Sequence, residues 1–201
     1  MLLSQKLNSD LRPQRKEGEI PLRQFNKGDE IIISDSDIWQ IYRGVVQLSK
    51  VQQDGGETIL GWITANGTFG NCGNSSQVYR VVAMSNVYAR RYLPQNLIDH
   101  PLLARQLLAQ FSDRLIKSEQ LLSIIAIKRV EERFTQLLLM LKQDMGQDVD
   151  RGVRLQARFT HQQLAEAICT TRVTITRIMG DFQNRGLICF DRDRHIVCTN
   201  L

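Results

Sequence analysis

Cysteine is scarce in this sequence, and the few cysteines do not lie close together. The 201 residues include only four of them, Cys72, Cys169, Cys189 and Cys198. Metal sites and iron–sulfur clusters normally use cysteines in closely spaced pairs. The three histidines, His100, His161 and His195, are equally scattered. We therefore expect no metal, no cofactor and no disulfide.

Long apolar runs are also missing. No stretch approaches the ~20 apolar residues that a membrane span needs, and the N-terminus lacks the apolar core of a signal peptide. No Ser/His/Asp grouping or pair of carboxylates indicates a catalytic centre. Hydrophobic residues nevertheless make up 42% of the chain, and the formal net charge of +5 suits a polyanionic partner. These features predict a cytoplasmic protein that has no membrane contact and is not an enzyme.

The most informative segment is 160–178, which predicts two short helices joined by a tight turn. Thr160 can cap the first helix, with Gln163 bonding back to it as in a capping box. Either Thr170 or Thr171 can cap the second helix. A second helix rich in hydroxyls and arginines fits the major groove of DNA, where arginine can bond a guanine edge. An ordinary helical hairpin with solvated arginines is the alternative.

Segment 186–198 supports the DNA-binding interpretation, because it predicts two short strands around a charged turn. That is the wing of a winged helix, in which Arg192 and Arg194 can touch phosphates. On the second helix, either Val173 or Ile175 should be buried. The residues predicted to contact DNA are Thr160, His161, Thr170, Thr171, Arg172, Val173, Thr174, Thr176, Arg177 and Arg192.

The N-terminal half predicts a different architecture. Residues 1–18 form a polar, basic tail, and residues 19–100 are typical of a small barrel or roll of short strands separated by glycine-containing turns. The strands are expected at 31–33, 38–42, 45–49, 58–63 and 80–83.

A long helix is predicted over 101–127, because Pro101 can start it and the apolar spacing becomes helical. Alternating steps of three and four residues indicate a coiled-coil seam with one polar member. This seam either joins two copies in a parallel dimer or packs against the chain's own roll. A second helix is expected over 130–145 and a turn over 146–152, within a DNA-binding domain of 128–201. The seam residues are Leu108, Phe111, Leu115, Ser118, Leu122 and Ile125.

The predicted fold is α+β: an N-terminal antiparallel β-roll of the cupin-like or cyclic-nucleotide-binding type, a long helix and a C-terminal winged helix-turn-helix. This order resembles the CRP/FNR family of bacterial transcription regulators. The resemblance is specific in 133–139 and 163–177, and 171–177 looks most like the cyanobacterial nitrogen-control branch. It implies a homodimer on a twofold double-stranded DNA site, with Arg172, Val173 and Arg177 at the bases. It also implies RNA polymerase as a partner.

The chain departs from the family where a cyclic nucleotide would bind. Cyclic-AMP-binding members hold the ribose with a Gly-Glu pair and the phosphate with an Arg-Ser pair. Here Gly70 precedes Asn71, and Gln77-Val78 occupies the Arg-Ser position. Arg80 is close by, but its neighbours have a strand pattern. Cyclic nucleotide binding is therefore not expected.

The nitrogen-control branch senses 2-oxoglutarate, and Arg114 and Glu119 match that branch's ligand contacts. The matching arginine in the roll is replaced around Gln77, which leaves one arginine for two carboxylates. We favour a regulator that acts without an effector, with 2-oxoglutarate sensing as the alternative. Haem sensing stays a further alternative because haem ligands vary within the family. Family members also usually carry glycine at the position of Cys169, so a left-handed backbone is expected there.

Overall fold

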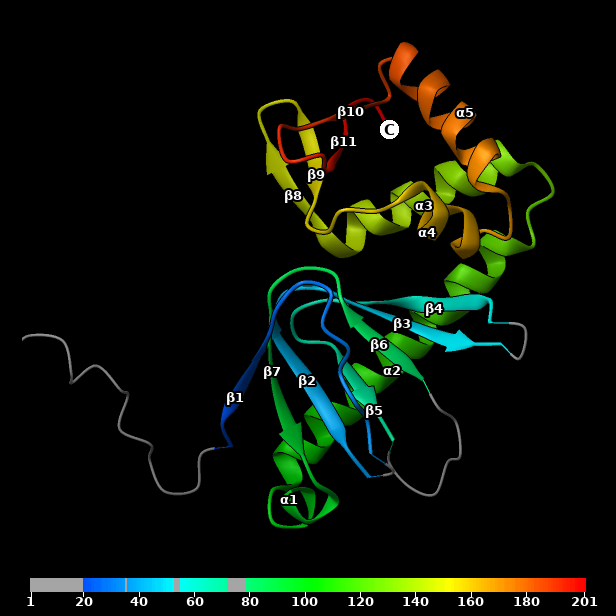
Figure 1. The fold of residues 1–201 in the computed structure, drawn as a ribbon. Coiled ribbons are helices and arrows are strands. Elements are labelled where there is room, and N and C mark those ends of the chain that lie inside the picture. The colour runs from blue at the N-terminus through cyan, green and yellow to red at the C-terminus, as the bar shows by residue number, and fades with distance from the viewer. Residues whose placement is uncertain (1–19, 35, 53–54, 72–78) are drawn as a thin grey trace, which may run out of the picture.

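The computed structural model describes residues 20–34, 36–52, 55–71 and 79–201. The predicted tail, residues 1–18, and the Gln77-Val78 pair lie outside this range. Figure 1 shows the roll below, the long helix α2 crossing behind it, and a unit of helices and short strands above. The α+β arrangement of antiparallel roll, long helix and winged helix-turn-helix is confirmed.

The roll consists of two antiparallel sheets with an apolar core between them. One sheet has the order β1-β7-β2-β5 and the other β4-β3-β6. Trp39 and Ile41 of the first sheet meet Leu48 and Val81 of the second in the buried cluster. The strands are β1 (Leu22–Phe25), β2 (Ile38–Arg43), β3 (Val46–Val51), β4 (Glu57–Ile63), β5 (Thr68–Gly70), β6 (Arg80–Ala83) and β7 (Val87–Tyr92).

The strand expected at 31–33 is wrong. Ile31 is buried and its N–H donates to the carbonyl of Val81 at 2.8 Å, but only Glu30 forms a bridge, with Val82. Ile32 is 75% exposed, so the three isoleucines do not continue a ladder. Strands β1, β5 and β7 were not predicted individually. Two of them are short, and β7 carries two adjacent arginines, which interrupt its apolar pattern.

Two helices follow the roll, α1 (Pro94–Ile98) and α2 (Pro101–Ile125). Proline at the first helical position of each fits its fixed φ and its missing N–H. Helix α2 ends two residues before the predicted end, and it buries Leu107, Leu121 and Ile124. It therefore lies across the roll with one face while other side chains stay in solvent.

The C-terminal unit combines three helices with one four-stranded sheet of order β10-β11-β9-β8. The turn expected over 146–152 is confined to residues 150–151, because β8 and the start of β9 occupy the other positions as a hairpin. Gly152, at φ +133°, allows this hairpin to approach the carbonyl of Cys198, which a Cβ would meet at 2.2 Å. The elements are α3 (Val130–Met145), β8 (Gly146–Val149), β9 (Gly152–Leu155), α4 (His161–Ala167), α5 (Arg172–Asn184), β10 (Ile188–Phe190) and β11 (Ile196–Cys198).

The roll and the C-terminal unit share one apolar core. Trp62 of β4 meets Phe159 edge to face, with ring centroids 5.3 Å apart. Beside them the side-chain amide of Gln163 donates to Oε1 of Gln47 at 3.0 Å, and Gln47 is buried. The two units are therefore packed together directly as well as joined through α2. Within the described residues, no helix has the length and apolar content to traverse a bilayer.

Candidate DNA-binding site and effector pocket

Both helices of the helix-turn-helix begin at the caps that the sequence predicts. Thr160 Oγ1 accepts the N–H of Gln163 at 3.1 Å, and the side chain of Gln163 accepts the N–H of Thr160 at 2.9 Å. This is the predicted capping box. At the second helix Thr171, not Thr170, is the cap, and its hydroxyl accepts the N–H of Thr174 at 3.1 Å. These bonds fix where α4 and α5 start and so fix the angle at which α5 leaves the turn.

Helix α5 has a buried face and an outward face. Ile175 is fully buried, while Val173 is 78% exposed, so the choice between these two residues is resolved. Arg172 and Arg177 lie on the exposed side with Val173. An exposed helix face carrying two arginines is the form that a major-groove reader needs.

Thr176 connects α5 to α4. Its hydroxyl donates to the carbonyl of Arg172 at 2.8 Å and also lies 2.8 Å from Nδ1 of His161. Because the hydroxyl proton of Thr176 is donated to Arg172, the hydroxyl oxygen must accept from Nδ1–H of His161. Nε2 of the neutral ring is then an acceptor. Burial, together with the nearby charges of Arg172 and Arg194, lowers the pKa of His161. The imidazole is therefore neutral near pH 7 and ties the two helices together.

The wing carries a charged turn, as predicted, and Arg192 is exposed on it. The carboxylate of Asp191 accepts two hydrogen bonds within the wing. Arg154 Nε donates to it at 2.6 Å, and the backbone N–H of His195 donates to it at 2.7 Å. Arg194 adopts φ +64° and lies over the Phe190 ring, 5.5 Å from its centroid. Arg192 is thus presented to solvent while its neighbours hold the turn in shape.

A basic cleft of about 760 Å³ lies between the roll and the C-terminal unit. Lys27 comes from the roll, Arg158 precedes α4, and Arg172 and Arg194 come from α5 and the wing. The sequence predicted a DNA contact for Arg172 and Arg194 but gave no indication of Lys27 or Arg158. No local pattern could have found them, because the cleft is assembled from segments far apart in the chain.

Cys169 occupies the turn between α4 and α5 in the left-handed region, at φ +52°. The expectation of a left-handed backbone there is confirmed. Its side chain is exposed, and the following N–H, of Thr170, donates to the carbonyl of Ala165 at 2.9 Å. A residue with a Cβ is less comfortable than glycine in this conformation.

Replacing Cys169 by glycine is therefore expected to stabilise the protein by about 1 kcal/mol, the usual scale of the left-handed penalty. Urea denaturation of the two proteins measures the difference. Cys169→Ser is the matched control, since it keeps the Cβ and should leave the free energy of unfolding nearly unchanged. An equal gain in both variants would show that the thiol, and not the backbone, is responsible.

The predicted seam on α2 divides into two groups. Leu108, Leu115 and Leu122 are spaced seven residues apart and are 67%, 60% and 65% exposed. Phe111, Ser118 and Ile125 are half-buried. Ile116, which the sequence analysis did not name, is also 61% exposed. The single chain thus leaves a leucine stripe uncovered along α2, while the neighbouring positions pack inward.

The two effector candidates are not brought together within one chain. Arg114 lines a cavity of about 350 Å³ beside Asn71 and Ser118. Its guanidinium carbon is 5.9 Å from the ring centroid of Tyr79. Glu119 is exposed on α2 and does not line that cavity.

Arg80 does not replace the missing arginine of the family. It donates to Glu30 at 3.3 Å and also bonds Glu57, and it alternates along β6 with the buried residues Val81 and Ala83. These two carboxylates raise the pKa of Arg80 by accepting hydrogen bonds from it. The guanidinium therefore belongs to an ion cluster on the outside of the roll.

Comparison with known proteins agrees with this architecture. Residues 132–201 match the model of the Crp-like helix-turn-helix domain. The global nitrogen regulator of Synechococcus elongatus is 30% identical, over 88% of this chain and 86% of that protein. Regulatory protein CysR of the same organism is 29% identical, over 80% of this chain and 75% of that protein.

Solved structures show the same fold. A CRP/FNR-family transcriptional regulator from Thermus thermophilus superimposes with a TM-score of 0.73 at 24% identity, covering 89% of this chain and 93% of its own. A second regulator from that organism, described as CRP family, superimposes with a TM-score of 0.76 at 16% identity, covering 88% of this chain and 91% of its own. With the long curated match and the winged helix-turn-helix, these findings identify the protein: it belongs to the CRP/FNR family of transcription regulators.

Proposed function

We propose that this regulator binds a palindromic DNA site as a homodimer. The observation that carries the proposal is the outward face of α5, where Arg172, Val173 and Arg177 are exposed together while Ile175 is buried behind them. Arginine favours guanine, and valine methyls can meet a thymine methyl. The expected half-site therefore contains GTA, as in the nitrogen-control branch. Two half-sites should lie about one helical turn, ~34 Å, apart.

The leucine stripe supports the dimer. Leu108, Leu115 and Leu122 recur at the heptad spacing of a parallel coiled coil, and water would otherwise cover them. Pairing two copies along α2 buries all three and places two winged units side by side. In this arrangement residues 19–100 form the sensor-like roll, 101–127 the dimerisation helix and 128–201 the DNA-binding domain. We place the protein in the cytoplasm, with RNA polymerase as its family-type partner.

DNA binding should not need a cyclic nucleotide. The position that holds the ribose in cyclic-AMP-binding members carries Asn71, whose side chain lacks a carboxylate. Arg80 is occupied by Glu30 and Glu57. A buried phosphate without an opposing charge is costly, so we expect the described residues to offer no suitable site to cyclic AMP or cyclic GMP.

A ligand-gated regulator that senses 2-oxoglutarate is the second candidate, favoured by one observation. Arg114 lines an open cavity from the helix that would form the dimer. In a dimer the exposed Glu119 of one copy could be brought near the cavity of the other. One arginine against two carboxylates is nevertheless a weak clamp.

Titration of labelled palindromic DNA with purified, nucleotide-free protein tests the proposal. Binding is expected at ~10⁻⁸ M or tighter. Cyclic AMP, cyclic GMP and 2-oxoglutarate should each change the affinity by less than about twofold, which is under ~0.5 kcal/mol. Tightening of tenfold or more by any one of them would contradict the effector-independent proposal. If only 2-oxoglutarate acts, Arg114 and Glu119 are the residues to replace.

A further inference from the structure

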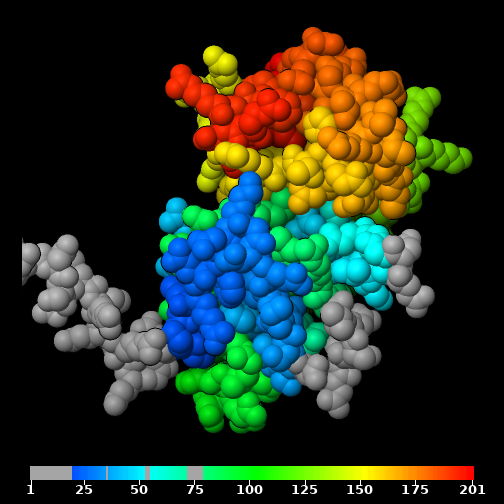
Figure 2. All heavy atoms as spheres, viewed as in Figure 1, coloured from blue at the N-terminus to red at the C-terminus, as the bar shows by residue number. Residues whose placement is uncertain are grey.

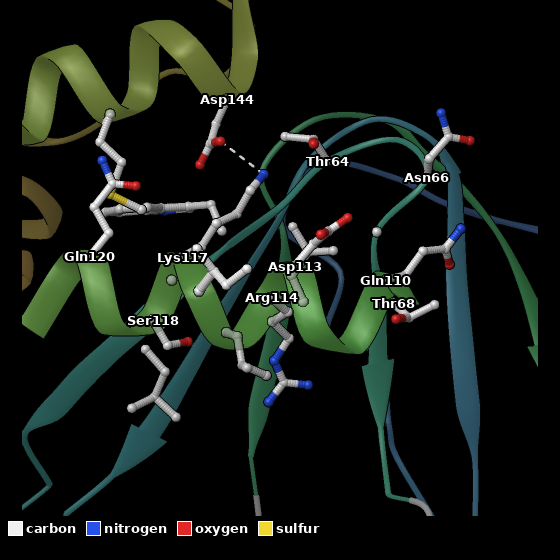
Figure 3. Close-up of a pocket in the computed structure, with 18 of the residues that line it drawn as sticks. Thr64, Asn66, Thr68, Gln110, Asp113, Arg114, Lys117, Ser118, Gln120 and Asp144 are labelled. Atoms are coloured by element: carbon white, nitrogen blue, oxygen red, sulfur yellow. Dashed lines mark ion pairs between the residues drawn. The ribbon is translucent and has the colours of Figure 1, made fainter. Parts of the chain in front are cut away.

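A cavity of about 330 Å³ lies where the roll, α2 and α3 meet. Figure 3 shows its lining, with α2 in front, α3 above and the loop of Thr64 and Asn66 beside it. The volume falls at the lower end of the ~300–1,000 Å³ usual for small-molecule sites. An occupant would touch the roll, the long helix and the first helix of the DNA-binding unit at once.

Helix α2 directs its polar side chains to two sides in this region. Asp113 and Lys117 point toward α3 and Thr64, whereas Arg114 and Ser118 point the opposite way (Figure 3). Arg114 and Ser118 also line the cavity that contains Asn71. The Asp113 side is therefore distinct from the ligand contacts that the family resemblance implies.

The charges on the Asp113 side favour a ligand that carries a cation. Asp113 makes no ion pair with any residue in the described part of the chain, and it is exposed to solvent at the cavity. Lys117 Nζ lies 2.8 Å from Oδ1 of Asp144. Arg114 also lines this cavity but points to the opposite side of α2 (Figure 3), so on the Asp113 side alone two carboxylates face one ammonium. A lysine ammonium has three donors, so Lys117 retains donors for a ligand oxygen after bonding Asp144.

Two buried polar atoms of the lining need partners. Trp62 Nε1 and Thr68 Oγ1 are inaccessible to solvent and form no hydrogen bond with any described residue. Both residues are more than nine-tenths buried. A buried polar atom without a partner destabilises the fold, so a local side-chain movement that brought either atom into contact with a polar ligand end would be favoured.

We propose that this cavity binds a small α-amino acid. Its ammonium would bond Asp113, its carboxylate would accept from Lys117, and a polar side chain would reach Trp62 or Thr68. A dicarboxylate without an ammonium would instead face the carboxylates of Asp113 and Asp144, which disfavour a second negative charge. The site thus differs in charge preference from one built for a phosphate or an oxo-dicarboxylate.

Such a ligand would stabilise the arrangement in which α2, the roll and α3 are packed together. A ligand shifts a conformational equilibrium only through its different affinities for the two states. This ligand has contacts on all three elements only when they are packed, so it favours the packed state. The proposal rests on the cavity and not on the DNA-binding function, so either can fail without the other.

Calorimetric titration of the full chain with three probes of the same carbon chain tests the charge preference. L-Glutamine, L-glutamate and 2-oxoglutarate differ in net charge, and only the first two carry an ammonium. We expect both amino acids to bind with Kd below ~1 mM and 2-oxoglutarate to bind at least tenfold more weakly. Absence of binding by both amino acids, or tighter binding of 2-oxoglutarate, would overturn the proposal.

Two variants test the assignment of the ammonium. Asp113→Asn should weaken both amino acids at least tenfold, while its melting temperature and its affinity for palindromic DNA stay those of the parent. Glu132→Gln is the matched control, because Glu132 is an exposed carboxylate on α3 outside this cavity. Unchanged amino-acid binding by Asp113→Asn, or an equal loss in the control, would refute the role of Asp113. DNA titration without any amino acid separates a failure here from a failure of the DNA-binding proposal.

Discussion

Replacing Leu115 by glutamate is expected to abolish the dimer and to reduce the affinity for palindromic DNA at least 100-fold. Leu115 is 60% exposed at the middle of the leucine stripe. In the dimer the change removes two buried leucines, worth roughly 1.5–3 kcal/mol each, and sets two like charges against each other. A monomer would hold one half-site only, near the ~10⁻⁴–10⁻⁶ M typical of non-specific contacts.

Sedimentation and DNA titration of the same sample measure both effects. Because the side chain is exposed in the single chain, the fold of the monomer should be unaffected. Ile32→Glu is the matched control, since Ile32 is an exposed isoleucine of the roll, 75% accessible, and is not part of α2. A Leu115→Glu protein that still sediments as a dimer would place the interface elsewhere.

Replacing Arg172 by alanine should cost about 1–3 kcal/mol per half-site and relax the preference for guanine. The guanidinium is exposed at the start of α5, where a helix entering the major groove brings its first residues to the base edges. Because a palindrome is read twice, the dimer should lose roughly 2–6 kcal/mol in all. Arg177→Ala should behave in the same way. Selection of bound sequences from a random pool, combined with titration, measures preference and affinity separately.

Arg192 in the wing provides the contrast. Its side chain is exposed on a turn and is expected to meet phosphate. Arg192→Ala should weaken all sequences about equally and reduce the salt dependence by about one phosphate contact. If the Arg172 and Arg192 variants both lose affinity without any change in base preference, α5 is not the reading helix.

Local signals in the sequence predicted the DNA-binding unit well. The capping box at Thr160 depends on residues near each other in the chain, so short-range rules for caps suffice for it. The choice between Val173 and Ile175 as the buried residue stayed open in the sequence, and the left-handed turn at Cys169 was expected from the family resemblance. The hairpin of β8 and β9 was missed because its glycines suggest a turn, while its pairing with β11 is a long-range contact.

The roll and the cavities were harder to predict for the same reason. Ile31 and Ile32 have the same strand preference, yet one is buried and the other exposed, and only the position of Val81 decides which. Asp113 gave no signal in the sequence, because its neighbours at the cavity, Thr64 and Asp144, lie on other elements. Sites assembled from distant segments need the tertiary structure to be recognised.

The contact between Trp62 and Phe159 has a consequence for how this molecule can melt and how it can evolve. The apolar cluster around these rings includes residues from the roll, from α2 and from the winged unit, and Figure 2 shows the roll and the winged unit in contact. Heating should therefore produce one cooperative transition in place of two. Exchanging the winged unit for that of a relative would also remove Phe159 and expose the Trp62 ring, unless the incoming unit brought an aromatic partner. The two halves of this chain can consequently accumulate changes at their junction only in matched pairs.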